Sequence, residues 1–303
     1  MTLKQVLNRA RGILVANNIE EAGLECELLL RHASRLSRVQ LYLDLDHELS
    51  ANEEADFWQL IKRRLNSEPT AYIIGHREFY GLDFYVEPGV FIPRPESELL
   101  VEQALELAQN RPVSSIAEIG TGCGAIAISL ALSLPQARIY ATDISASALK
   151  VALVNCQKHG VVDRVCLRQG DMIDPLPEPV DLIIANLPYV KEVELSQISS
   201  ASFEPQLALG GGCDGLEKIR RLCQQVGDRL CPEGCLLLEI GQGQARAVTL
   251  FLSRLFPSAK IEVIPDLSGI DRVVCLTFTP PAKGLSLRSK LYVESDCLRE
   301  AGR

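Results

Sequence analysis

Four consecutive residues, Asn186-Leu187-Pro188-Tyr189, combine an amide, a proline and an aromatic ring directly after an apolar run. The side-chain oxygen of Asn186 and the peptide carbonyl of Leu187 can both accept N–H hydrogen bonds. Together they could hold a planar NH2 group, either a primary amide or an aromatic amine, while Tyr189 packs against its plane. Such a nitrogen is a poor nucleophile because its lone pair is delocalised. The motif therefore predicts a site that aligns this nitrogen with an electrophile.

A glycine-rich segment, Gly120-Thr121-Gly122-Cys123-Gly124, precedes this tetrad in the chain. Glycines let the backbone approach a ligand closely because no Cβ intervenes. Asp143 ends the next predicted strand, where a carboxylate can accept hydrogen bonds from two ribose hydroxyls. The pattern Gly120-x-Gly122-x-x-Ala125 also satisfies the dinucleotide fingerprint, so a nicotinamide dinucleotide stays an alternative at this point. Another explanation is that the glycines only allow tight packing of the strand against the helix. The placement of Asp143 argues against it.

Asp171 and Met172 follow the third predicted strand of this region. Their position favours contacts with an adenine ring, with the carboxylate near the exocyclic amine and the thioether against the ring face. A turn that carries a solvated aspartate explains the same two residues nearly as well.

The tetrad favours methyl transfer over hydride transfer. A methyl carbon on a sulfonium requires little beyond in-line alignment and a water-poor pocket, whereas hydride transfer has no obvious use for the tetrad. The sequence contains no serine–histidine–acid or metal-ligand constellation, because its ten cysteines lack Cys-x-x-Cys spacing and its four histidines are scattered. We expect no bound metal, and we interpret nearly all the thiols as small buried apolar side chains in a reducing compartment.

Alternating strands and helices must position these groups. Near-continuous apolar runs, typical of a sheet covered on both faces, predict seven strands, at Ser115–Ile119, Arg138–Thr142, Val165–Arg168, Asp181–Ala185, Leu236–Ile240, Ile261–Ile264 and Val273–Thr277. The predicted fold class is α/β, with a doubly wound, mostly parallel sheet within residues 93–280. The glycine-rich segment and the tetrad would then lie side by side at the carboxyl edge of the sheet.

The region before the sheet is different in pattern. Residues 1–70 are predicted to form a small all-helical domain, in which Ser50 and Glu53 have capping-box spacing. Residues 71–92 are predicted to form a β-hairpin linker, with Gly81-Leu82-Asp83 between its strands.

The composition of the 303 residues is that of a soluble globular protein, with 47% hydrophobic residues and no apolar stretch long enough to span a bilayer. The N-terminus lacks a signal-peptide core, so the cytoplasm is the expected compartment. The net charge of -8 argues against a nucleic-acid partner, and Lys62-Arg63-Arg64 is interpreted as a solvated helix face. Residues 281–303 are predicted to be a loosely attached polar tail.

Further motifs extend from Leu3 to about Thr277. They are Pro69-Thr70-Ala71-Tyr72-Ile73-Ile74-Gly75, Glu78-Phe79-Tyr80-Gly81, Phe91-Ile92-Pro93-Arg94-Pro95-Glu96-Ser97-Glu98, Phe203-Glu204-Pro205, Gly211-Gly212-Cys213-Asp214-Gly215-Leu216, Leu238-Glu239-Ile240-Gly241 and Asp271-Arg272-Val273-Val274. With these motifs the chain closely resembles the protein-(glutamine-N5) methyltransferases that modify peptide chain release factors. The tetrad alone is weakly specific, whereas the Ile-Pro-Arg-Pro-Glu segment beside a helical domain is much more telling.

The resemblance implies a class I, Rossmann-like methyltransferase fold. It implies S-adenosyl-L-methionine as donor and S-adenosyl-L-homocysteine as product, held by Gly120 to Gly124, Asp143, Asp171, Met172 and Asn186. It also implies that Asn186 to Tyr189 bind the glutamine of a Gly-Gly-Gln loop. The helical domain would dock the release factor, and the protein is expected to be a monomer. Arg94 and Glu96 would brace the cofactor-pocket entrance or, equally, pin the interdomain helix.

Two residues depart from the family pattern. Leu187 replaces the first proline of the usual Asn-Pro-Pro-Tyr, which frees one backbone torsion but keeps the carbonyl that must accept a hydrogen bond. Met172 occupies a position that is often aromatic, which could weaken stacking on the cofactor.

Two alternative functions stay open from the sequence. An adenine-N6 methyltransferase acting on rRNA or DNA would use a related tetrad, but it predicts a basic face that the charge of -8 does not supply. A non-catalytic docking protein that holds the cofactor is a second alternative, disfavoured by the intact Asn186 and Asp143.

Overall fold

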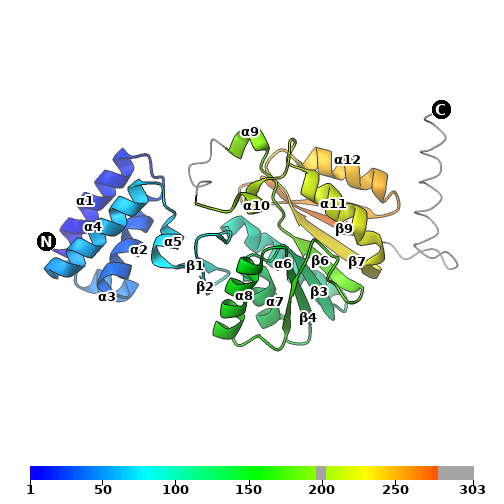
Figure 1. The fold of residues 1–303 in the computed structure, drawn as a ribbon, viewed down its shortest axis with the longest axis horizontal. Helices are drawn as coiled ribbons and strands as arrows, with labels where there is room; N and C mark the ends of the chain where they lie inside the picture. The colour runs from blue at the N-terminus through cyan, green and yellow to red at the C-terminus, as the bar shows by residue number, and fades with distance from the viewer. Residues whose placement is uncertain (196–202, 279–303) are drawn as a thin grey trace.

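Apolar strand segments assemble into one seven-stranded sheet in the computed structural model, which describes residues 1–195 and 203–278 (Figure 1). The predicted strand positions are confirmed, with ends that differ by one or two residues except in β7, which begins six residues before the predicted start at Leu236. The strands are β3 (Ser115–Ile119), β4 (Arg138–Asp143), β5 (Val165–Gln169), β6 (Val180–Ala185), β7 (Leu230–Glu239), β8 (Lys260–Pro265) and β9 (Asp271–Thr277).

The strand order is β5-β4-β3-β6-β7-β9-β8, in which β3 to β7 pair in parallel and β9 is antiparallel to both its neighbours. The order reverses between β3 and β6, and such a switch point is where open α/β sheets bind ligands. Ile119 pairs with Ala185 at the ends of these two strands. Gly120 and Asn186, the next residues of each strand, therefore begin the neighbouring loops at this edge.

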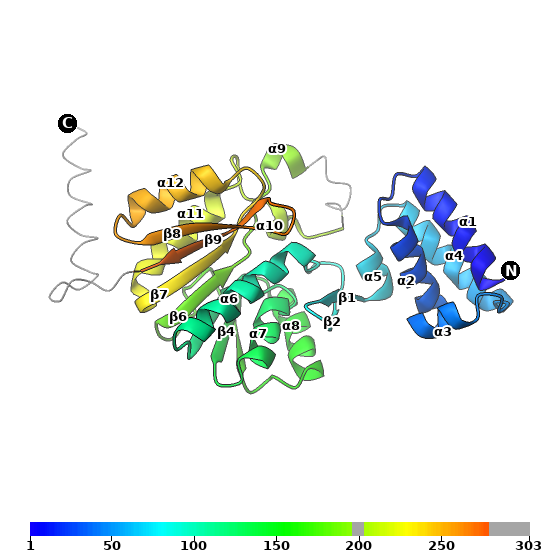
Figure 2. The same cartoon turned by 180° about the vertical axis from the view of Figure 1, so that it is seen from behind.

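Side chains from alternate positions of each strand enter two separate apolar cores. Ile116 packs with helices α6 (Glu98–Asn110), α7 (Ala125–Ser133) and α8 (Ala146–Lys158). Its neighbour Ala117 packs on the opposite face, with α11 (Glu217–Gln225) and α12 (Ala245–Leu255). Figures 1 and 2 show the sheet between these two helical layers. The doubly wound, mostly parallel α/β fold is thus confirmed.

Helices also form the first part of the chain, as predicted. They are α1 (Leu3–Ala16), α2 (Ala22–Ser34), α3 (Arg38–Leu43) and α4 (Ala51–Leu65) (Figure 2). Their apolar side chains form a third core. Ser50 caps α4 as its spacing predicts, since its hydroxyl accepts from Glu53 N at 3.3 Å and Glu53 Oε2 accepts from Ser50 N at 2.9 Å. Arg64, predicted on a solvated helix face, is instead half-buried in an ion pair with Glu25.

A short helix and a hairpin connect the two domains: α5 (Thr70–Ile74), β1 (His76–Phe79) and β2 (Leu82–Tyr85). Tyr80 and Gly81 form the turn with φ of 52° and 71°, so Leu82 and Asp83, expected between the strands, belong to β2. Two consecutive positive φ values suit the right-handed twist of the paired strands. The α5 helix crosses the expected boundary at residue 70, because Tyr72 packs in the sheet domain and Ile73 in the helical core.

The remaining elements are short: η1 (Pro95–Ser97), α9 (Glu192–Leu195), α10 (Gln206–Leu209) and η3 (Val226–Asp228). The predicted tail at 281–303 lies outside the described residues. Within the described part, no helix combines the length and apolarity needed to cross a membrane. Its nine cysteines are free, but Cys166 and Cys213 are exposed, so the expectation that nearly all thiols are buried is wrong for these two.

Candidate active site

The glycine-rich loop and the tetrad face each other across the end of the β3–β6 pair. A Cβ placed on Gly120 would lie 3.5 Å from Leu187 Cδ2 and 3.9 Å from the Asn186 carbonyl oxygen. The positive φ of 76° at Gly120 suits glycine, which has no Cβ to clash. The two segments predicted to share one site therefore lie in direct contact.

A cavity of about 380 Å³ opens at this point of the sheet edge. Its lining includes every residue that was predicted to bind the cofactor or the substrate except Gly124. Gly124 instead begins α7, where a Cβ would approach Ala152 of helix α8 to 3.3 Å. Its lack of a side chain serves packing of α7 on α8.

Asp143, at the end of β4, shapes the loop opposite it. Its Oδ2 accepts from Gly122 N at 2.9 Å, and its Oδ1 accepts from Ser145 N at 2.8 Å. Burial raises the pKa of this carboxyl, while these backbone donors act in the opposite direction. Each oxygen has a further lone pair, so the carboxylate could still accept hydroxyl donors from the cavity.

Asp171 and Met172 line the same cavity after β5. The Asp171 carboxylate forms an ion pair through Oδ2 with Arg221 of α11, a partner that the sequence did not suggest. Met172 adopts a φ of 50°, and its carbonyl accepts from Thr142 Oγ1 at 3.0 Å. A left-handed conformation at a non-glycine residue is uncommon and is found at functional sites.

The Asn186 amide is held by a residue far away in sequence. Its Nδ2 donates to Ser97 Oγ at 2.8 Å, and Ser97 is buried in the short helix η1 before α6. With Nδ2 directed at Ser97, the other amide atom, Oδ1, can act as an acceptor for a bound NH2 group.

The backbone of the tetrad is fixed by close packing. Leu187, in place of the usual proline, is 5% exposed and belongs to the α11–α12 core. Burial thus restrains this residue where a proline ring would otherwise do so. A Cβ on Gly211 would lie 2.7 Å from Tyr189 Cα and 2.8 Å from Pro188 O, so only glycine fits there. Gln244 Nε2 also donates to Tyr189 O at 3.0 Å.

Tyr189 is anchored at its hydroxyl, which donates to Glu239 Oε1 at 3.3 Å. Burial and the neighbouring carboxylate raise the pKa of Tyr189, so the phenol is neutral at physiological pH. Its ring packs over the end of β7, where a Cβ on Gly241 would lie 3.0 Å from Tyr189 Cδ2.

Several lining or supporting residues were given no role from the sequence: Ser97, Glu118, Glu204, Arg221 and Glu239. Buried Glu118 accepts from Thr121 Oγ1 at 2.5 Å and from Ala127 N at 3.0 Å, and burial raises its pKa to about 8. The sequence did contain a signal for Glu118, which is a carboxylate near a strand end, two residues before the glycine turn. Ser97 lies within the Pro-Arg-Pro-Glu-Ser segment that resembles the family, but nothing in its residue type or spacing indicated a role of its own.

Arg94 lines the cavity and pairs with the buried carboxylate of Glu204. Glu204 Oε2 also accepts from Ile92 N at 3.4 Å. The ion pair joins the Pro-Arg-Pro-Glu segment to the Phe203-Glu204-Pro205 segment beside the cavity, which favours the bracing role for Arg94. Glu96 is not part of the lining.

The cavity fits a nucleoside-bearing methyl donor on three observations. Gly122 has a φ of 57° and open space where a Cβ would stand, which leaves room beside the loop. Asp143 supplies a carboxylate with free lone pairs for hydroxyl groups. Ile144 and Met172 add apolar surface, and Ile144 is 51% exposed at the cavity wall. The described residues hold no group of three or more His, Cys, Asp or Glu side chains suited to a metal.

Comparison with known proteins decides the family. A model described as "PrmC N-terminal domain" matches residues 5–75, and one described as "Methyltransferase small domain" matches residues 81–203. Release factor glutamine methyltransferase from Moorella thermoacetica is 43% identical over 274 residues, which cover 90% of this chain and 97% of that protein. The chain belongs to the release factor glutamine methyltransferase family.

A second member of this release factor glutamine methyltransferase family, from Geobacter sulfurreducens, is 39% identical over 276 residues, covering 90% of this chain and 95% of that protein. Among solved structures, the hMettl16 catalytic domain in complex with the MAT2A 3'UTR hairpin 6 superposes with a TM-score of 0.55 at 15% identity. The match covers 67% of this chain and 78% of that one. At this identity the likeness shows the methyltransferase fold alone.

Proposed function

We propose that this protein transfers a methyl group from S-adenosyl-L-methionine to the side-chain amide nitrogen of a glutamine in the Gly-Gly-Gln loop of peptide chain release factors. The observation that carries the proposal is the contact of Gly120 with the Leu187 side chain and the Asn186 carbonyl oxygen, which brings the cofactor loop and the amide-binding tetrad into one cavity. The relatives named above carry the corresponding activity in their names.

The chemistry follows from the groups in the cavity. S-Adenosyl-L-methionine, when bound, supplies a methyl carbon activated by its positive sulfur. Asn186 Oδ1 and the Leu187 carbonyl would accept the two N–H bonds of the glutamine amide and direct its nitrogen at that carbon. The nitrogen forms the new N–C bond as the S–C bond breaks, and it releases one proton to solvent. Tyr189 would limit the tilt of the planar amide and exclude water from it.

A methylation assay tests this proposal. The purified protein is incubated with S-adenosyl-L-methionine and either a release factor or naked rRNA, and digests of each are analysed by mass spectrometry. We expect one added methyl group on the Gly-Gly-Gln glutamine and none on RNA. Methyl groups on adenine alone would replace the proposal by the adenine-N6 alternative. Cofactor binding without methylation of either substrate would favour the non-catalytic docking protein.

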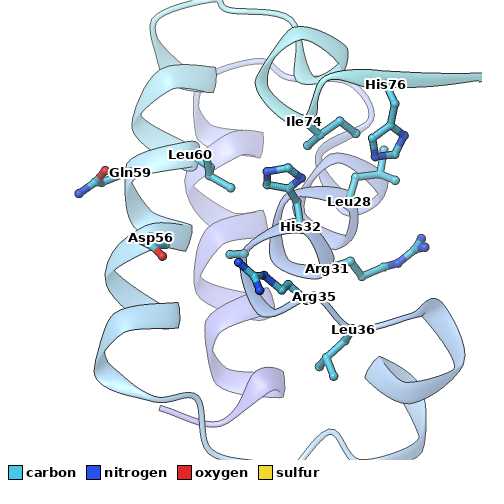
Figure 3. A pocket seen from close by; sticks show the side chains of 11 residues that line it. Leu28, Arg31, His32, Arg35, Leu36, Asp56, Gln59, Leu60, Ile74 and His76 are labelled. Carbon is cyan, nitrogen blue, oxygen red and sulfur yellow. The ribbon is translucent and has the colours of Figure 1, made fainter. Parts of the chain in front are cut away.

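We further propose that the helical domain docks the release factor, at a hollow of about 660 Å³ between α2, α4 and the start of β1 (Figure 3). Arg31 and Arg35 at the end of α2 supply its positive charge beside one acidic residue, Asp56 of α4, over an apolar base that includes Leu28 and Ile74. His32 also lines the hollow, but burial lowers its pKa, so it adds no positive charge at neutral pH. This charge would complement an acidic segment of a release factor, although the chain as a whole carries a net charge of -8.

A charge substitution tests the docking surface. Arg35 caps α2 with a φ of 56°, a conformation that asparagine tolerates, so Arg35→Asn removes the charge without new strain. We expect KM for the release factor to rise about tenfold, the effect of one charge-assisted contact, with no change for a short Gly-Gly-Gln peptide. Exposed Arg254 of α12, changed to Asn, is the matched control. Equal KM values for Arg35→Asn and wild type would exclude this hollow as the docking surface.

A further inference from the structure

Glu239 is a buried carboxyl at the carboxyl end of β7, and the chemistry proposed above does not use it. It is 1% exposed, and its Oε2 has no hydrogen-bond partner among the residues that the structure describes. Its Oε1 accepts from the Tyr189 hydroxyl. A buried carboxyl oxygen without a partner is costly, so a role is expected for it.

Ser97 connects this carboxyl to the Asn186 amide. Ser97 Oγ accepts from Asn186 Nδ2 at 2.8 Å, so the serine hydroxyl must direct its own proton elsewhere. The Ser97 hydroxyl acts to lower the pKa of Glu239, so the two groups are neighbours, and Glu239 Oε2 has no other partner among the described residues. Glu239 is therefore the acceptor available for the serine proton.

We propose that Glu239 is a positioning residue that sets the direction of the Asn186 amide through Ser97, an inference that rests on the proposed glutamine methylation. As a carboxylate, Glu239 accepts from Ser97, and Ser97 accepts from Nδ2, which leaves Oδ1 for the substrate amide. As a carboxylic acid, Glu239 can donate to Ser97, whose proton then goes to Asn186 Oδ1. The amide then turns and presents Nδ2, a donor, to the NH2 group that it must bind.

The surroundings of Glu239 allow this change near physiological pH. Burial raises its pKa to about 7. The neighbouring Ser97 hydroxyl, the hydrogen bond from Tyr189 and the charge of Arg272 on β9 lower the pKa of Glu239, whereas Glu96 of η1 raises it further. As pH falls through about 7, Glu239 therefore takes up a proton. The productive direction of the Asn186 amide is then lost.

Kinetics at different pH values test the proposal on the full-length protein. For the wild type, kcat for release factor methylation should fall about tenfold per pH unit below the Glu239 pKa, as expected for one essential ionised group. The Glu239→Gln variant should lose about 10- to 100-fold in kcat, as after the loss of a positioning contact, and its kcat should not vary with pH in this range. Binding of S-adenosyl-L-homocysteine, measured by calorimetry, should be unchanged in this variant. Glu262→Gln, on the exposed edge strand β8, is the matched control.

Two further measurements separate positioning from a structural role. Ser97→Ala should lose as much activity as Glu239→Gln, and the double variant should lose no more, because both act on one amide. In NMR spectra, the side-chain amide signals of Asn186 should shift with a midpoint near pH 7 in the wild type and not in Glu239→Gln. This readout needs no turnover, so it tests Glu239 even where release factor methylation itself fails.

A pH profile retained in Glu239→Gln, additive losses in the double variant, or amide signals of Asn186 that do not respond to pH would each overturn the assignment. Should Glu239→Gln fail to fold, the wild-type NMR titration and the Ser97→Ala pH profile, expected to be flat, decide the question.

Discussion

Asn186 Nδ2 lies 2.8 Å from Ser97 Oγ, although the two residues are 89 positions apart in the chain. Asn186 follows strand β6 of the sheet, and Ser97 lies in the segment that leads from the hairpin into α6. The contact therefore makes the direction of the reactive-site amide depend on the Pro-Arg-Pro-Glu-Ser segment. It also gives that segment a function beyond joining two domains.

Replacement of Asn186 by alanine should separate catalysis from cofactor binding. Asn186→Ala removes one of two acceptors for the glutamine amide, so kcat should fall by about 100-fold or more, as after loss of an orienting group. Rates with the release factor and calorimetry with S-adenosyl-L-homocysteine check this. A variant with wild-type turnover would remove the tetrad from the mechanism.

Replacement of Asp143 should instead weaken the cofactor complex. Hydrogen bonds to a charged group contribute about 1.5–3 kcal/mol each, so Asp143→Ala should raise the Kd for the donor by about tenfold or more. Calorimetry measures this, with Asp163→Ala, at an exposed loop position, as the control. Unchanged affinity would show that Asp143 does not contact the cofactor.

A substitution at Gly211 tests whether packing fixes the tetrad. A Cβ would lie 2.7 Å from Tyr189 Cα, so Gly211→Ala must displace the tetrad backbone. Overpacking of this kind costs about 1–3 kcal/mol of folding stability, and we expect kcat to fall with it. Gly12→Ala in α1 has open space around the new methyl group and should keep wild-type activity. Urea unfolding and the methylation assay measure both effects; a fully active Gly211→Ala would contradict the packing argument.

The stability of the protein should respond to the ionisation of Glu118. Burial raises its pKa from 4.5 to about 8, so the folded state favours the neutral acid. The stability that this preference contributes is fully present below pH 4.5 and is lost as pH rises through about 8. Glu118→Gln, which cannot ionise, should remove this part of the pH dependence. The difference in urea midpoint between wild type and variant should therefore change across this range. A constant difference would mean that Glu118 does not titrate there.

Much of this fold could be predicted because its signals are local. Continuous apolar runs define buried parallel strands, and the ends of β3 and β6 meet at the same edge, so Gly120 and Asn186 could be placed together from the sequence. The hairpin turn differs from its prediction because it uses Tyr80 at a positive φ, a conformation that its residue type does not predict.

The supporting residues could not be predicted in the same way. Glu239 reaches Tyr189 across 50 positions and Glu204 reaches Arg94 across 110, pairings that only the packed sheet brings together. The ion pair of Asp171 with Arg221 depends on where α11 crosses the sheet. Each of these contacts arises from tertiary packing rather than from a periodic pattern or a turn signal.

The most direct test of the central claim is a crystal structure with S-adenosyl-L-homocysteine and a Gly-Gly-Gln peptide or release factor bound. We predict that the glutamine side-chain nitrogen lies within hydrogen-bond distance, about 2.7–3.2 Å, of both Asn186 Oδ1 and the Leu187 carbonyl oxygen. The same nitrogen should face the cofactor sulfur, so that a methyl group on the sulfur would lie between the two atoms. A glutamine bound away from these two oxygens, or a cofactor outside the cavity beside Gly120, would contradict the account.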